Sequence, residues 1–73
     1  MINFEQALEI IHVNNPNVNV TSCKEVERYY VFNLLPEIAN SSVHLVEKKT
    51  GCYSVEYFGV IKDEAIIKRI DIA

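Results

Sequence analysis

The sequence predicts a small α+β domain in which one N-terminal helix packs on a four- or five-stranded antiparallel β-meander. Three observations lead to this prediction. Residues 3–14 carry apolar side chains at helical spacing, most of the remaining chain alternates apolar and polar residues, and Gly51 interrupts that alternation where a hairpin should turn. Because the connections are short, strands that are neighbours in sequence should pair antiparallel. Residues 1–73 are expected to form a single domain.

A helix is predicted over residues 3–14. Asn3 can act as the N-cap by accepting a hydrogen bond from the amide of residue 5 or 6, and Gln6 stands where the partner of a capping box belongs. The next apolar residues follow the i, i+3, i+4, i+7 spacing of one buried helix face: Phe4, Ala7, Leu8 and Ile11. The Asn14-Asn15-Pro16 segment should end the helix, because a residue before proline avoids the helical region.

The first strand is predicted to begin at about Asn17, where Val18 and Val20 alternate with polar residues. Lys24-Glu25 breaks the alternation and is expected to be a turn.

The second strand is predicted over residues 27–34, which are rich in β-branched and aromatic side chains. Its heavier apolar side should meet the helix and consists of Tyr30, Phe32 and Leu34, whereas Tyr29, Val31 and Asn33 point the other way. A loop is expected over residues 36–42, since Pro36 cannot donate a hydrogen bond to a sheet.

Residues 43–57 are predicted to form a β-hairpin whose loop is residues 49–51. Gly51 would supply the left-handed position of this three-residue loop. Counting outward from the loop pairs Leu45 with Val55 and His44 with Glu56. This register would bury Val43, Leu45, Val55 and Tyr57, and would leave His44, Lys48, Ser54 and Glu56 in solvent.

Residues 60–73 fit two periodicities. Ile66, Ile70 and Ala73 have helical spacing, and Ile66, Lys68, Ile70 and Ile72 have strand spacing. The abundance of isoleucine favours a final strand, which a turn over residues 62–64 would precede.

Composition and charge exclude several kinds of partner. The net charge is −3, and the basic clusters, Lys48-Lys49 and Lys68-Arg69, lie beside acidic residues, so no nucleic-acid partner is expected. The apolar runs are far shorter than the roughly 20 residues that span a bilayer, so no membrane association is expected. A cytoplasmic location is predicted because residues 1–15 lack the features of a secretion signal.

No catalytic, cofactor-binding or metal-binding site is predicted. His12 is expected to interact favourably with the C-terminal end of the helix, since it has no histidine or cysteine within one turn to share a metal. The two cysteines, Cys23 and Cys52, are expected to stay reduced in the cytoplasm. A small thiol or histidine enzyme that uses His44, Glu56 and Cys52 is the least favoured alternative.

The sheet face opposite the helix is the predicted recognition surface. It would be uncovered and would carry Tyr29, Val31, His44, Val46 and Glu56, with Phe58 as a further candidate. Tyrosine offers a large amphipathic contact area and is enriched at interfaces. The predicted function is therefore a non-enzymatic module that binds another protein. The alternative is a structural homodimer, formed through an exposed edge strand or through residues 65–72.

Three short motifs suggest a family. They are F-x-x-A-L-x-x-I from Phe4, E-x-Y-Y-V-F from Glu27, and K-K-T-G from Lys48, and they fall within residues 2–58. Their order resembles the PepSY-like group of small bacterial domains and the single-helix immunity proteins of bacterial toxin systems. The resemblance implies a non-enzymatic protein that restrains a peptidase or binds a toxin; small phage proteins also fit. The expected absence of a signal peptide departs from PepSY domains, which usually act outside the cytosol.

Overall fold

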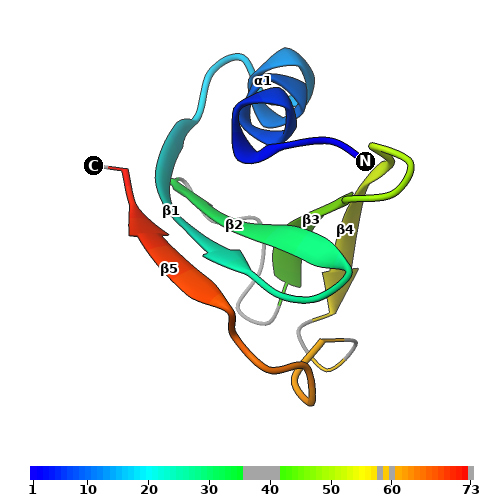
Figure 1. Cartoon of the computed structure of the whole chain (residues 1–73). Coiled ribbons are helices and arrows are strands. Elements are labelled where there is room, and N and C mark those ends of the chain that lie inside the picture. The colour runs from blue at the N-terminus through cyan, green and yellow to red at the C-terminus, as the bar shows by residue number, and fades with distance from the viewer. Residues whose placement is uncertain (36–41, 58, 60, 73) are drawn as a thin grey trace.

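The computed structural model describes residues 1–35, 42–57, 59 and 61–72. These residues form one helix and a five-stranded antiparallel sheet with the strand order β4-β3-β2-β1-β5. The elements are α1 (Phe4–Asn14), β1 (Asn19–Glu25), β2 (Tyr29–Leu35), β3 (Ser42–Glu47), β4 (Tyr53–Tyr57) and β5 (Lys68–Asp71). The predicted α+β fold is confirmed. Strands β1 to β4 form the meander, and β5 returns to pair with β1 at the far edge of the sheet (Figure 1).

Helix α1 begins with the predicted capping box. The Asn3 side chain accepts a hydrogen bond from the Gln6 amide at 2.8 Å, and the Gln6 side chain accepts one from the Asn3 amide at 3.0 Å. At the other end, the Asn15 amide donates to the Ile11 carbonyl at 2.9 Å. Local sequence therefore sets both ends of the helix.

One face of α1 packs on one face of the sheet (Figure 1). The buried residues between them are Ala7, Ile11, Val20, Cys23, Tyr30, Phe32, Leu34 and Val46. Phe4 adds aromatic contacts, with its ring centroid 6.2 Å from that of Tyr30 and 6.1 Å from that of Phe32. The prediction that Tyr30, Phe32 and Leu34 face the helix is confirmed.

Strand β1 runs through the turn predicted at Lys24-Glu25, and that prediction is wrong. The chain turns at residues 26–28, where the Val26 amide donates to the Tyr29 carbonyl at 3.0 Å. A β-bulge between Val20 and Ser22 also changes the phase of the strand. Val20 and Cys23 therefore both face the helix, although simple alternation would place them on opposite faces.

The hairpin between β3 and β4 is offset by one residue from the predicted register. Its loop covers residues 48–51, because the Glu47 amide donates to the Cys52 carbonyl at 2.9 Å and the Gly51 amide donates to the Glu47 carbonyl at 2.8 Å. Gly51 does hold the expected left-handed conformation, with φ of 76°. The observed pairs are Ser42 with Tyr57, Val43 with Glu56, His44 with Val55, Leu45 with Ser54 and Val46 with Tyr53.

Lys48 explains the offset. The predicted register places it in the ladder and in solvent, and this prediction is wrong, because Lys48 is buried in the loop. Its amide donates to the Arg28 carbonyl at 2.9 Å, its carbonyl accepts from the Ile2 amide at 2.8 Å, and its Nζ lies 2.6 Å from Glu25 Oε2. These partners belong to three other parts of the chain, so contacts distant in sequence hold Lys48 out of the ladder.

The offset changes which hairpin residues are buried. His44 is buried on the helix side, whereas Val55 and Tyr57 are exposed, so the predictions for these three residues are wrong. Val43 and Leu45 are buried as predicted, but they lie on the sheet face away from α1. Glu56 is exposed as predicted.

That second face has a small core of its own, so the prediction that it is uncovered is wrong. The core consists of Val26, Val31, Val43, Leu45 and Ile61, with Tyr29 packed beside it. Ile61 belongs to the connection that carries the chain from the β4 edge to the β5 edge (Figure 1). The predicted turn over 62–64 and final strand are both found here, and the Glu64 amide donates to the Ile61 carbonyl at 3.0 Å.

Some predictions concern segments outside the described residues. Residues 36–41 of the predicted loop are among them, while Ser42 belongs to β3. Phe58, a candidate for the second face, and Ala73, which fitted the helical spacing, are also outside the described residues.

Candidate functional site

The five residues predicted to form a recognition surface do not share one face. Val31, Val46 and His44 are only 2%, 0% and 5% exposed. Val46 and His44 lie under α1, and Val31 lies in the second core. Tyr29 is half-buried beside that core, and Glu56 is exposed on β4. The predicted surface is therefore not formed.

The histidine–carboxylate pair of the enzyme alternative is not formed either. His44 stands opposite Val55, and Glu56 stands opposite Val43 on the other face of the sheet. Cys52 is exposed at the end of the hairpin loop. His44 and Glu56 therefore cannot act together on one substrate as base and orienting group.

His44 instead belongs to a partly buried hydrogen-bonded chain with Tyr53 and Asn15. Its Nδ1 lies 2.8 Å from Tyr53 Oη, and the two rings stack with their centroids 5.9 Å apart. Asn15 Nδ2 donates to Tyr53 Oη at 3.2 Å and to the Ile11 carbonyl at 3.0 Å. Burial lowers the pKa of His44, which favours the neutral imidazole. The Tyr53 hydroxyl can then donate to Nδ1, so the chain links the end of α1 to β3 and β4.

Across residues 1–35, 42–57, 59 and 61–72, no three His, Cys, Asp or Glu side chains gather as metal ligands would. Both cysteines are free thiols, and burial raises the pKa of Cys23 to about 12. Among the described residues, no helix has the length and apolar character to cross a bilayer.

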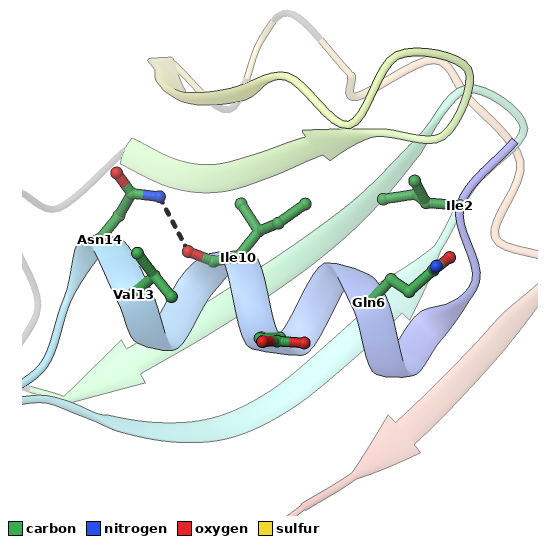
Figure 2. A pocket seen from close by; sticks show the side chains of 6 residues that line it. Ile2, Gln6, Ile10, Val13 and Asn14 are labelled. Atoms are coloured by element: carbon green, nitrogen blue, oxygen red, sulfur yellow. Dashed lines mark hydrogen bonds between the residues drawn. The ribbon is translucent and has the colours of Figure 1, made fainter.

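A shallow groove of about 360 Å³ lies on the outward flank of α1 (Figure 2). It is lined by Ile2, Gln6, Glu9, Ile10, Val13 and Asn14. Ile2 and Ile10 also approach Gly51, so the groove lies next to the hairpin loop. A lining of apolar and amide side chains with one carboxylate can hold an apolar group, but it provides no nucleophile.

The β4 edge, defined here as Tyr53–Tyr57, exposes two large hydrophobic side chains at one side of the sheet. Val55 is 41% exposed and Tyr57 is 66% exposed, because α1 lies over β1, β2 and β3 and does not reach them. Both side chains point to the helix side of the sheet. Among the described residues, β4 pairs with β3 alone.

The hydrogen-bonding pattern fixes which backbone groups of the β4 edge are free to bind. In an antiparallel pair, the backbone N–H and C=O groups of successive residues point alternately toward and away from the neighbouring strand. The hydrogen bond from the Glu47 amide to the Cys52 carbonyl shows that the backbone groups of Cys52 point toward β3. The backbone groups of Ser54 and Glu56 therefore face β3. Those of Tyr53, Val55 and Tyr57 face outward, where another strand could pair with them.

The two edges of the sheet differ in charge. The β4 edge carries one charged residue, Glu56, whereas β5 carries Lys68, Arg69 and Asp71 within its short length. Charged residues, above all lysine, protect edge strands from pairing with other chains. The β4 edge lacks this protection. The scarcity of charged residues in Tyr53–Tyr57 could have identified the candidate surface from the sequence, once β4 was known to be an edge strand.

Comparison of the chain with protein-family models, with curated proteins and with solved structures gave no match. The resemblance to PepSY-like domains and immunity proteins therefore stays a prediction.

Proposed function

We propose that this chain is a non-enzymatic protein-binding module that pairs with its partner at the β4 edge. One observation carries the proposal: Val55 and Tyr57 are large exposed hydrophobic residues on an edge strand with a single charge. A strand added to β4 would hydrogen-bond to the outward backbone groups of Tyr53, Val55 and Tyr57, and its side chains would cover the two exposed ones. The proposal includes a cytoplasmic location and a bacterial or phage origin.

Affinity capture from the native host tests this function. The wild-type chain is compared with the double variant Val55→Lys/Tyr57→Lys, and bound proteins are quantified by mass spectrometry. The lysines oppose strand addition by charge and are tolerated by folding because both positions are exposed. We expect the double variant to capture at least about tenfold less of any partner that the wild type captures. The loss of strand pairing and the loss of apolar contact should each cost about 1 kcal/mol or more.

Ile67→Lys serves as the matched control, because Ile67 is 61% exposed beside the opposite edge. This variant should capture the same partner as the wild type. Equal capture by all three proteins would count against the proposed function, as would a wild-type chain that captures no specific protein and does not self-associate through β4.

A structural homodimer through the other edge is the second candidate. Ile66, Ile67 and Ile72, which flank β5, are 42%, 61% and 37% exposed, so this edge also presents apolar side chains to solvent. In this case Ile67→Lys, and not Val55→Lys, should convert a dimer to a monomer in sedimentation velocity experiments.

A further inference from the structure

We propose that the partner of the β4 edge is a second copy of this chain, paired antiparallel to the first about a two-fold axis at Val55. This inference rests on the proposed function and names its partner. Two features of β4 support it: the distribution of its charge and the contrast between β4 and β5.

The two-fold pairing satisfies all the outward backbone groups of the strand. With the axis at Val55, this residue faces Val55 of the second copy, and Tyr53 faces Tyr57. These are the residues whose N–H and C=O groups point outward, so each facing pair can exchange two hydrogen bonds. The two sheets would become one continuous sheet, with both copies of α1 on the same side.

Charge and the extent of strand overlap favour this register over its two neighbours. About Val55, the Glu56 carboxylate of each copy stands opposite the Ser54 hydroxyl of the other. A pairing centred on Glu56 would place two carboxylates directly opposite each other, which is destabilising. A pairing centred on Ser54 would leave Tyr57 outside the overlap of the two β4 strands.

The side chains on the helix side complete the interface. Val55 would pack against Val55 of the second copy, and Tyr57 would lie beside Tyr53, whose hydroxyl is already held by His44 and Asn15. Cross-strand aromatic and β-branched pairs of this kind stabilise sheets. The contact would remove from solvent the exposed surface of Val55 and Tyr57, the two large exposed hydrophobic residues of β4.

The opposite edge makes other assemblies less favourable. Pairing of β4 with β5 of a second copy would be head-to-tail and would build a ring or an open filament, whereas β4–β4 pairing closes after two copies. The charged residues of β5, namely Lys68, Arg69 and Asp71, oppose addition of a strand there. A single strand pair buries less than the roughly 1,600 Å² of a standard interface, so a dissociation constant in the micromolar range is expected.

Sedimentation velocity of the purified chain, from about 10 µM to about 1 mM, tests the inference. We expect a monomer–dimer equilibrium in the wild type and a dissociation constant at least about tenfold weaker in Val55→Lys, which brings two lysines together at the axis. Ile67→Lys should retain the wild-type equilibrium.

A second pair of variants keeps the inference testable if Val55→Lys disturbs folding. Ser54→Lys would place a lysine opposite Glu56 of the second copy twice in each dimer, and should tighten the dimer by about two- to tenfold. Ser54→Glu, its matched control, would place a carboxylate there and should weaken the dimer by a similar factor.

A wild-type chain that stays monomeric throughout overturns the inference, as does a dimer that Ile67→Lys, but not Val55→Lys, dissociates. Open-ended assemblies also overturn it. The proposed function fails separately: it stands if a monomeric chain still captures a host protein through Val55 and Tyr57, and falls if neither kind of partner binds at β4.

Discussion

His44 Nδ1 lies 2.8 Å from the hydroxyl of Tyr53, on the sheet face that α1 covers. Tyr53 in turn accepts a hydrogen bond from Asn15, the residue that caps the end of α1. The helix end, β3 and β4 are thus connected through three side chains, one of them titratable near neutral pH. The observed hairpin register makes this connection possible, because it places both His44 and Tyr53 on the helix side.

Stability should fall as the pH is lowered from about 7 to about 5. Burial holds the pKa of His44 below its ordinary value of 6.5, so the unfolded chain binds a proton more readily than the folded one. The free energy of unfolding should therefore decrease as the pH falls through 6.5 toward the folded-state pKa, by at most about 1.4 kcal/mol per pH unit for one proton. Urea unfolding at several pH values measures this slope.

His44→Gln should flatten the slope, since glutamine keeps a hydrogen-bond acceptor for Tyr53 but does not titrate. His12→Gln changes an exposed histidine and should retain the contribution of His44. If the free energy of unfolding depended on pH equally in His44→Gln and in the wild type, His44 would not be the group responsible.

Replacing Tyr53 with phenylalanine should destabilise the fold by about 1–3 kcal/mol. The change removes a hydroxyl that bonds to both His44 and Asn15, and it leaves their polar atoms without that partner in a partly buried region. Tyr57→Phe is the control, because the Tyr57 side chain is exposed, and its effect should stay within about 0.5 kcal/mol. Urea denaturation of the two variants would show the difference, and equal stabilities would refute the role of the Tyr53 hydroxyl.

Replacing Glu25 should destabilise the fold more than replacing Lys48, although the two residues form one ion pair. The Lys48 side chain is 9% exposed, its Nζ lies 2.6 Å from Glu25 Oε2, and the Nζ is 5.3 Å from the ring centroid of Tyr30. Glu25→Gln leaves the ammonium without a counter-charge and should cost about 1–3 kcal/mol. Lys48→Met removes the charge and keeps an aliphatic chain under the ring, so it should cost less.

The double variant Glu25→Gln/Lys48→Met tests the coupling in a thermodynamic cycle. Its destabilisation should be smaller than the sum of the single effects, by about 1 kcal/mol. Lys49→Met, in the same loop but exposed, should have little effect. Additive single effects would mean that the pair does not stabilise the loop.

The two cysteines should react with thiol reagents at very different rates. Cys52 is exposed, whereas Cys23 is buried between the sheet and α1 and has a pKa raised to about 12, so its reactive thiolate is scarce at neutral pH. A native chain should therefore react at one thiol with iodoacetamide, and Cys23 should react at least about 100-fold more slowly. Labelling of Cys52→Ser, with and without urea, isolates Cys23, and fast labelling without urea would contradict its burial.

Short-range patterns in the sequence determined the elements of this protein. The capping box of Asn3 and Gln6, the apolar stripe of α1 and the left-handed Gly51 depend on residues a few positions apart, so they could be predicted without knowing the fold. The choice of a strand over a helix for residues 68–71 followed in the same way from residue type.

Only the tertiary structure decided the hairpin register and, through it, the candidate binding surface. The loop around Gly51 could close with Lys48 in the ladder or outside it, and bonds from Arg28, Ile2 and Glu25 hold it outside. The exposure of Val55 likewise depends on how far α1 extends over the sheet. These outcomes depend on contacts between residues far apart in the chain, and the alternation of apolar and polar residues along one strand does not record such contacts.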